Sequence, residues 1–299
     1  MEIEDTYCEI FDGLFTRICI TAKDEQRLKR ATYGVTALPS TVFGEAEGGI
    51  EKWLSEHETP DARKGALVQL WVNYGKDKDA VKKLEYEISK RIRQGILVVP
   101  TTSVFNAFTL ELDSEGKIDT INRIGHCGDG YETIEYRFGR EVIVVPIMMG
   151  EFVIEHYLGY KKGVMGGNLW FLCETLDAAL EAGEKAISTI NKIEGVITPF
   201  DICAAGSKPE TKYPEIGPTT NHPYCPTLKQ KISGSKVPEG VNFIPEIVIN
   251  GISLDSVREA MKAAMDSVRD VERLVKISAG NYGGKLGKYK VYLREVMDN

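Results

Sequence analysis

Hydrophobic positions along the chain repeat one order of elements, and the two copies are residues 67–100 and 243–278. Each copy starts with a β-rich run that closes with an asparagine and a glycine, which are turn residues. A segment with apolar residues every three or four positions then predicts a helix, and another apolar run predicts a second strand. Aligned on Asn73 and Asn250, these β-α-β units lie about 177 residues apart. The expected helices cover 79–94 (Val81, Leu84, Ile88, Ile92) and 254–271 (Val257, Met261, Ala264, Val268), and the second strands cover 96–100 and 274–278.

A further β-α-β unit precedes each copy, at residues 16–43 and 168–200. Two such units in series can fold as a four-stranded antiparallel sheet with both helices on one face, the split β-α-β or ferredoxin-like arrangement, although doubly wound α/β folds use the same elements. We predict an α+β fold with two ferredoxin-like lobes, residues 1–110 and 160–299, related by a weak internal repeat. A β-rich insert, residues 111–159, connects them, with strands at 141–148 and 151–157. The helix of the second lobe would bury Leu176, Leu180, Gly183, Ile187 and Ile190.

Charge and composition narrow the class of protein. Acidic residues outnumber basic ones by 44 to 37, a net charge of −7 that argues against a nucleic-acid binder. The hydrophobic fraction of 42% is enough for a sizeable core. The first ten residues carry four acidic side chains and no basic one, unlike a signal peptide, and no apolar run approaches the roughly 18–20 residues of a membrane span. We therefore expect a cytoplasmic protein without a membrane segment.

Cysteines and histidines give no sign of a metal site. The six cysteines contain no C-x-x-C pair, and Cys19 and Cys173 lie in apolar runs, so buried free thiols are expected. The four histidines show no ligand spacing. His126 and Cys127 adjoin Asp129 in a glycine-rich stretch, but a turn explains that stretch more simply than a catalytic triad.

Two glycine clusters and one loop-rich segment are candidate binding elements. Residues 276–289 (KISAGNYGGKLGKY) could bring backbone N–H groups to an anion or a carbonyl oxygen, and residues 163–168 (GVMGGN) precede a strand. A tight turn or a bulge explains either cluster equally well. Residues 199–239 hold seven of the twelve prolines and are a candidate site wall.

Glu246 is the most unusual single residue. Strand alternation in residues 244–250 (IPEIVIN) places its side chain on the face opposite Ile247 and Ile249. Such a carboxylate either points to solvent at a sheet edge or is partly buried, in which case its pKa rises and suits proton transfer. The residues alone favour the exposed position.

Several strings together resemble one family. They are EIEDTY, VPTTSVFNA, GDGY, GEF followed by GVMGGN, EGVITPF, EIVING and KISAGNYGGKLGKY, in an order and spacing that resemble formylmethanofuran:tetrahydromethanopterin formyltransferase over essentially the whole chain. The resemblance implies two ferredoxin-like lobes, a homotetramer built as a dimer of dimers, and active sites near subunit contacts. It also implies formyl transfer between the coenzyme substrates formylmethanofuran and tetrahydromethanopterin, in archaeal one-carbon metabolism and methanogenesis, with no metal and no tightly bound cofactor.

The resemblance assigns roles to residues of this sequence. Glu246 corresponds to the family's proposed catalytic carboxylate, which reverses the expectation from the residues alone. Its counterpart in the internal repeat is Gln69, which cannot titrate, so we expect one active site per subunit, in the second lobe. The implied substrate-binding residues are Thr101, Thr102, Ser103, Phe105, Asp129, Gly130, Tyr131, Gly166, Gly167, Asn168, Ser207, Lys208, Ser278, Asn281 and Lys285.

Some segments depart from the family's usual sequence. Residues 199–208 (PFDICAAGSK) replace PFPGGIVASGSK, His126 and Cys127 replace an aromatic pair, and Pro245 replaces a tyrosine. These departures suggest a diverged paralogue with its own cofactor preference or activity. Two alternatives therefore stay open: a formyltransferase-like subunit of a larger transferase/hydrolase complex, and a non-catalytic protein that keeps the fold.

Overall fold

The computed structural model describes residues 1–37, 46–75, 79–108, 113–208 and 210–298, which form two compact units. Unit 1 contains residues 1–12 and 163–299, and unit 2 contains residues 13–162. These units differ from the predicted boundaries 1–110, 111–159 and 160–299 in two ways. The first twelve residues belong with the C-terminal part, and the insert belongs with unit 2. The cause is the great length of strands β2 (Tyr7–Thr21) and β10 (Tyr157–Cys173), each of which contributes to both units.

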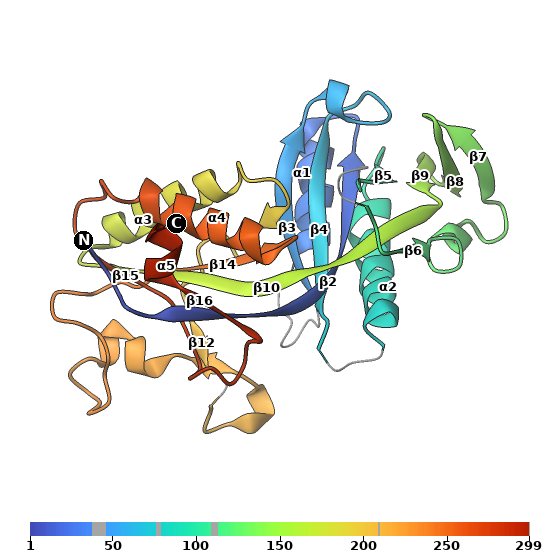
Figure 1. The fold of residues 1–299 in the computed structure, drawn as a ribbon. Helices are drawn as coiled ribbons and strands as arrows, with labels where there is room; N and C mark the ends of the chain where they lie inside the picture. The colour runs from blue at the N-terminus through green and yellow to red at the C-terminus, as the bar shows by residue number, and fades with distance from the viewer. Residues whose placement is uncertain (38–45, 76–78, 109–112, 209, 299) are drawn as a thin grey trace. The chain divides into compact units, whose positions relative to one another are not determined.

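Unit 2 contains the first ferredoxin-like arrangement. Its third strand lies between the second and the first, and its fourth strand lies on the other side of the first, giving the order β3-β4-β2-β5. All three pairings are antiparallel, as the split β-α-β arrangement requires. The elements are β2, α1 (Glu25–Thr36), β3 (Glu47–Leu54), β4 (Gly65–Asn73), α2 (Ala80–Arg91) and β5 (Ser103–Asn106) (Figure 1).

Unit 1 repeats this order with its own strands. The sequence β11-β14-β10-β15 again places the third strand between the second and the first. The prediction of two ferredoxin-like lobes is therefore confirmed. The elements are β10, α3 (Leu176–Ile190), β11 (Val196–Ile197), β14 (Glu246–Gly251), α4 (Leu254–Ser267) and β15 (Leu274–Ser278), with β1 (Glu2–Ile3), β16 (Tyr289–Tyr292) and α5 (Leu293–Asp298) added at the termini.

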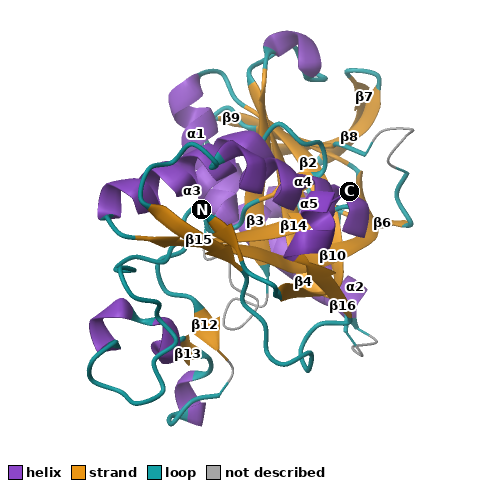
Figure 2. Ribbon diagram, turned by 60° about the vertical axis from the view of Figure 1, so that its left-hand side comes forward, coloured by secondary structure: helices purple, strands orange, loops and turns teal. Residues whose placement is uncertain are grey.

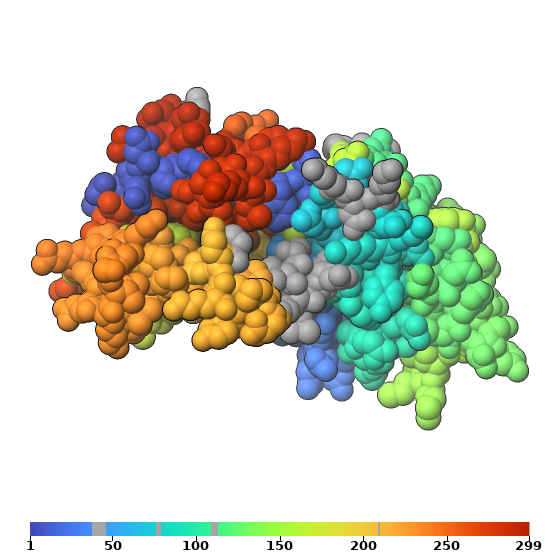
Figure 3. Space-filling view, turned by 90° about the horizontal axis from the view of Figure 1, so that it is seen from below, coloured from blue at the N-terminus to red at the C-terminus, as the bar shows by residue number. Residues whose placement is uncertain are grey.

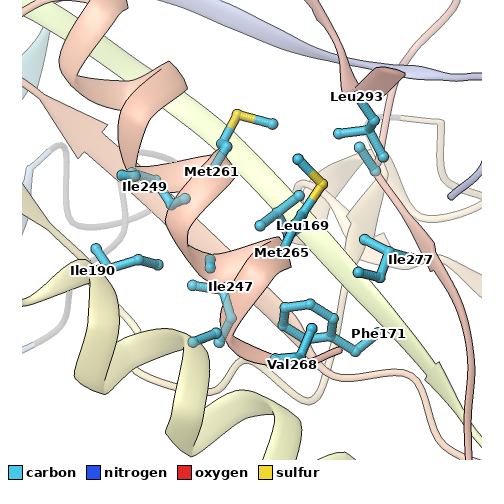
Figure 4. Close-up of a cluster of buried hydrophobic side chains, with 14 of the residues drawn as sticks. Leu169, Phe171, Ile190, Ile247, Ile249, Met261, Met265, Val268, Ile277 and Leu293 are labelled. Atoms are coloured by element: carbon cyan, nitrogen blue, oxygen red, sulfur yellow. The ribbon is translucent and has the colours of Figure 1, made fainter. Parts of the chain in front are cut away.

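The helices of each unit cover one face of its sheet and bury an apolar core there. In unit 1, Ile247 and Ile249 of β14 meet Met261 and Met265 of α4 (Figure 4). The predicted buried face of α3 is wrong in part, because Leu176 and Leu180 are exposed. The helix instead packs through small side chains, which let it approach its neighbours closely: Ala178, Ala179, Ala182, Gly183 and Ala186, together with Ile190. In unit 2, Val81 is likewise exposed, whereas Leu84, Ile88 and Ile92 are buried.

The predicted strand at residues 96–100 is instead the end of a π-helix followed by a turn. The chain continues from α2 into a π-helix, Ile92–Leu97, and the strand begins only at Ser103. Gly95 lies against Gly34 of α1, and a Cβ on Gly95 would come within 2.8 Å of the Gly34 carbonyl carbon. The apolar run therefore serves helix packing, which periodicity cannot distinguish from a buried strand. The other strand predicted in this lobe, residues 37–43, falls largely outside the described residues.

The insert forms the antiparallel strands that the sequence predicts. Strand β8 (Arg140–Ile147) pairs with β9 (Gly150–Glu155) and with β7 (Thr133–Arg137), while β6 (Gly116–Asp119) pairs with β10. Strand β9 also runs parallel to β5, which joins the insert to the sheet of unit 2. No helix among the described residues is long and apolar enough to cross a membrane.

The second face of the unit 1 sheet is covered by a long irregular segment, residues 199–245. Its described residues, 199–208 and 210–245, contain the short pair β12 (Ser207–Lys208) and β13 (Thr219–Thr220) and a few 3-10 turns. Figure 2 shows the helices on one side of these strands and the loops with β12 and β13 on the other. In Figure 3 the amber and orange atoms of this segment face the viewer. Trp170 and Leu172 pack under it against Val237 and Val241, so the segment forms a wall over the polar face of β14.

Candidate active site

Four residues form a row across the sheet of unit 1, beneath the wall of residues 199–245. Glu246 at the start of β14 lies opposite Trp170 of β10, and Trp170 lies opposite Ser278 of β15. On its other side Glu246 forms an isolated bridge with Cys203. Directly opposed residues of antiparallel strands point to the same face, so these side chains share one surface. The row Cys203, Glu246, Trp170 and Ser278 is the candidate active site.

The Glu246 carboxyl is buried among neutral groups. The residue is only 8% exposed, and the Trp170 indole Nε1 donates a 2.9 Å hydrogen bond to its Oε1. Cys203 is the residue opposite Glu246 on the neighbouring segment, and its side chain is partly exposed. Within the described part of the chain, no lysine, arginine or histidine forms an ion pair with this carboxylate. Desolvation therefore dominates and raises the pKa of Glu246, while the hydrogen bond from Trp170 partly opposes the rise.

Tyr282 supplies a phenol close to this carboxyl. Its hydroxyl donates a 2.8 Å hydrogen bond to the carbonyl oxygen of Ser207. Burial and the charge of Glu246 raise the pKa of Tyr282 to about 12, so the phenol is neutral in any physiological medium. The phenol proton is thus engaged by Ser207, and the carboxyl with the raised pKa is the group that could donate to an oxyanion.

Close packing fixes the Trp170 indole that binds Glu246. Tyr224 lies edge-on to it, with ring centroids 4.7 Å apart. On the opposite side a Cβ on Gly280 would come within 2.6 Å of the indole Cζ2, so only glycine fits there. Asn168 holds Gly280 in place, since its Oδ1 accepts from the Gly280 N–H at 2.8 Å and its Nδ2 donates to the Gly280 carbonyl oxygen at 3.3 Å.

The glycine-rich loop at residues 276–289 does cradle an anion, but that anion is the protein's own Glu9. Oε1 of Glu9 accepts from the N–H groups of Tyr282 and Gly284 at 2.6 and 2.7 Å. Oε2 accepts from Leu286 and Gly287 at 2.7 and 2.8 Å. Desolvation opposes the charge, yet these four backbone donors keep the pKa of Glu9 below its usual value. The loop is thus fixed by an internal carboxylate, and these N–H groups are already bonded.

The second glycine cluster is a bulge in β10. The register with β14 shifts between Val164 and Gly167, which confirms the bulge interpretation for residues 163–168. Gly166 has a φ of 89°, and a Cβ there would lie 2.6 Å from the Phe11 ring. Its N–H donates to the Asn250 side chain at 3.1 Å.

Comparisons with known proteins identify the family. Residues 1–147 match the family described as formylmethanofuran-tetrahydromethanopterin formyltransferase, and residues 150–296 match the description FTR, proximal lobe. The chain belongs to this formyltransferase family.

Its relatives span the full chain. A formylmethanofuran–tetrahydromethanopterin formyltransferase-like protein from Methanopyrus kandleri is 60% identical over 99% of this chain and 97% of its own length. The formyltransferase from Methanothermus fervidus is 42% identical over 99% and 98%. The solved Methanosarcina barkeri formyltransferase has a TM-score of 0.89 at 39% identity, over 99% and 98% of the chains. A formyltransferase/hydrolase complex from Methylorubrum extorquens with methylofuran gives 0.87 at 32%, over 99% and 96%.

Of the binding residues that the formyltransferase resemblance implies, eight lie in unit 1, and one of them, Ser278, belongs to the row. Asn168 and Ser278 are buried in the sheet next to Trp170, and Ser207 accepts from Tyr282. Asn281 donates to the Thr6 hydroxyl at 3.0 Å. The remaining members are Gly166 and Gly167 in the bulge, Lys208 in β12, and the exposed Lys285 in the glycine loop.

The implied binding residues of unit 2 are largely engaged within that unit. Thr102 is buried and donates to the Ile96 and Val99 carbonyl oxygens at 3.0 Å, and Ser103 accepts from Arg63 at 2.8 Å. Thr101 has a φ of 71° and its carbonyl oxygen accepts from Arg63 at 2.5 Å. Phe105 is fully buried, edge-on to Phe138. Asp129, Gly130 and Tyr131 form an exposed turn, in which Asp129 and Gly130 have positive φ.

Some residues around the carboxyl escaped the sequence analysis. Trp170 and Tyr282 are ordinary aromatic residues in sequence, and only the strand register and the closing of the C-terminal loop bring them to Glu246. Cys203 was expected to be a buried free thiol, but it is partly exposed, as is Cys225, and Cys127 is exposed. Cys19 and Cys173 are buried free thiols as predicted, and burial raises the pKa of each to about 12. The described residues contain no group of histidine, cysteine and acidic side chains arranged to hold a metal ion.

Proposed function

We propose that this protein transfers a formyl group between formylmethanofuran and N5 of tetrahydromethanopterin, and that Glu246 is its catalytic residue. One observation carries the proposal: among the described residues this buried carboxyl accepts a hydrogen bond from the neutral Trp170 indole and forms no ion pair with a cation. A carboxylate with a structural role at such a depth is normally paired with a cation. A solitary one with a raised pKa is typical of an acid/base group.

The chemistry requires what this carboxyl can supply. Attack by the N5 amine on the formamide carbon forms a C–N bond and a tetrahedral intermediate whose oxygen becomes negative. Collapse of that intermediate breaks the C–N bond to methanofuran, whose nitrogen gains a proton as N5 loses one. In the protonated form, Glu246 donates to the oxyanion or delivers the proton to the leaving nitrogen.

Binding roles are proposed for the remaining residues. Lys208 and Lys285 carry positive charges on the loops around the row, where they would attract the carboxylates and phosphate of the coenzyme tails. Ser207, Ser278, Asn168 and Asn281 would contribute polar contacts. The cytoplasmic homotetramer, the archaeal setting and the substrate-binding roles of Thr101–Phe105 and Asp129–Tyr131 stay predictions.

Two substitutions at one position test the proposal and separate its two mechanisms. Formyl transfer by Glu246→Ala should fall by about 10²–10⁴-fold, the usual contribution of a positioned acid/base group. Glu246→Gln keeps a donor but cannot release a proton. If the Gln variant transfers formyl groups much faster than the Ala variant, Glu246 acts by donating a hydrogen bond to the oxyanion. If both variants lose the same factor in rate, Glu246 acts by proton transfer.

The control is Glu259→Gln, which removes an exposed carboxylate from α4 in the same unit. It should retain the wild-type rate. Wild-type rates in both folded Glu246 variants would refute the proposal.

A second candidate function is formyl transfer inside a larger assembly. It is favoured by the likeness to the Methylorubrum extorquens formyltransferase/hydrolase complex, at a TM-score of 0.87. Native mass measurement of the protein purified from its own cells distinguishes the two. A mass equal to a whole number of 33.2 kDa chains supports the free enzyme, and stoichiometric additional subunits support the complex.

A further inference from the structure

A pocket of about 420 Å³ lies in unit 2, between the C-terminal end of α2 and the 3-10 turn Gly125–Gly128. Lys90 and Arg93 line it from the helical side. Arg123 and His126 line it from the side of the turn. Each of the nine lining residues has a side chain that can donate a hydrogen bond, and none of them is an aspartate or a glutamate. In a chain with a net charge of −7, this lining is complementary to a ligand that is negatively charged and rich in acceptor oxygens.

Buried carboxylates outside this lining orient two of the basic side chains. Lys90 Nζ donates to Glu87 Oε1 at 2.6 Å, and the Glu87 side chain is 2% exposed. His126 Nδ1 lies 2.7 Å from Glu132 Oε1, and the Glu132 side chain is 8% exposed. These contacts leave two N–H groups of Lys90 and Nε2 of His126 unpaired by the described residues. The basic groups are therefore held by partners outside the lining, as outer partners hold the ligands of a metal site.

Arg93 contributes a charge that no described carboxylate balances. Within the segments that the structure describes, its guanidinium forms no hydrogen bond and no ion pair. Arg123 binds Glu85 through Nε at 2.8 Å, and its two terminal nitrogen atoms have no partner in the described part of the chain. Arg93 belongs to the π-helix Ile92–Leu97, and such helices are rare and frequently mark functional sites. The π-helix thus brings an unpaired guanidinium to a pocket that already holds three other basic groups.

We propose that this pocket binds a phosphate group, with Arg93 as its main ionic partner and the other three basic groups as further hydrogen-bond donors. A phosphate presents acceptor oxygens in several directions and carries about one to two negative charges near neutral pH, and a guanidinium binds it through two parallel hydrogen bonds. A single carboxylate has only two oxygens and would leave more of the donors unpaired. The volume of the pocket admits either free inorganic phosphate or the phosphate of a coenzyme tail. The site lies in unit 2 and requires nothing of Glu246, so it stands independently of the proposed catalytic role.

Cys127 provides a local readout that needs no enzyme activity. Its thiol is exposed and lines the pocket, whereas Cys225 is a partly exposed thiol in unit 1. Iodoacetamide is uncharged, so its reaction with Cys127 reports the occupancy of the pocket, and peptide mass spectrometry gives the rate at each cysteine separately. Phosphate replaces chloride at constant ionic strength. At a phosphate concentration of about ten times the dissociation constant, alkylation of Cys127 should slow by about tenfold, and alkylation of Cys225 should not change.

Substitutions of single arginines separate specific binding from the general attraction of charge. Arg93→Gln should raise the dissociation constant for phosphate by about 10- to 100-fold, since it removes charge-assisted hydrogen bonds. Arg93→Lys keeps the charge without the planar fork, so its loss of affinity should be smaller. Arg27→Gln is the matched control, because Arg27 is an exposed arginine on α1 of the same unit, paired with Asp24 at 3.2 Å. It changes the net charge equally and should leave phosphate binding as in the wild type.

A second titration, with tetrahydromethanopterin in place of inorganic phosphate, identifies the source of the phosphate. If the coenzyme protects Cys127 and Arg93→Gln weakens that protection, the pocket binds a coenzyme tail. If inorganic phosphate alone protects Cys127, the pocket binds the free anion. No protection by either compound, or protection that Arg93→Gln weakens no more than Arg27→Gln does, would overturn the inference.

Discussion

Each unit has a polar side chain at the equivalent position of the equivalent strand, but the groups that surround the two side chains differ in charge. In unit 2 that residue is Gln69, whose Nε2 donates to Glu51 at 2.8 Å. Glu51 in turn binds Arg17 through two hydrogen bonds of 2.9 and 2.6 Å, so its charge is compensated. In unit 1 the residue is Glu246, and the position opposite it, held by Arg17 in unit 2, is occupied by Trp170. An indole offers one hydrogen bond and no charge.

This difference shows how one fold serves two purposes. A buried carboxylate with a bidentate arginine beside it stays ionised and holds strands together. A buried carboxylate whose cross-strand neighbour is an indole is desolvated without a compensating charge. Its pKa is therefore raised, and its protonated form persists to a higher pH. The repeat therefore supplies a buried polar position in each unit, and its cross-strand neighbour is a charged arginine in unit 2 and a neutral indole in unit 1.

The largest effect is expected in unit 2. Glu51→Gln removes the charge of the carboxylate that binds Arg17 through two hydrogen bonds, so the buried ion pair is broken. The free energy of unfolding should fall by about 3–5 kcal/mol, measured by urea denaturation. The formyl-transfer rate of the protein that remains folded should be close to wild type. A loss of unfolding free energy below about 1 kcal/mol would mean that the pair does not stabilise the fold, which would contradict the contrast drawn between the two units.

The next largest effect concerns Glu9, the other buried carboxylate of unit 1. Its charge is compensated by backbone hydrogen bonds from the glycine loop. Glu9→Gln weakens four backbone hydrogen bonds to the glycine loop, and we expect a loss of about 1.5–3 kcal/mol at neutral pH. Because the pKa of Glu9 is lowered in the folded state, its stabilisation exists above the unfolded-state pKa and disappears as pH falls through the folded-state pKa. The gap between wild type and variant should therefore close in acid. A difference in unfolding free energy that does not change with pH would contradict the account that these backbone N–H groups bind an ionised Glu9.

The smallest effect is a gain in stability. Glu246 has a raised pKa in the folded state, so it favours folding only at low pH and disfavours it as pH rises through the folded-state pKa. Glu246→Gln should be more stable than wild type by about 1–2 kcal/mol in alkaline solution and equal to it in acid. Denaturant titrations at several pH values measure the difference. A variant less stable than wild type at every pH would place Glu246 among the structural carboxylates.

The internal repeat made most of the fold predictable, because both lobes follow one pattern of β-rich and helical runs. The π-helix at Ile92–Leu97 was missed, since a short apolar run fits a strand or a packed helix equally well. Glu246 was noticeable as a carboxylate in an apolar strand, but its burial depends on Trp170 and Cys203, and strand register is not visible in the sequence. The pairing of Glu9 with the glycine loop was equally hidden, because it joins residues more than 270 positions apart.

The most direct test of the central claim is the protonation state of one side chain. A difference infrared titration between wild type and Glu246→Gln isolates the carboxyl signal of Glu246 and requires no substrate. The account predicts a protonated-carboxyl band that persists to a pH clearly above that of an ordinary glutamate, since desolvation raises this pKa. A band that converts to carboxylate at or below the ordinary glutamate value of 4.5 would contradict it.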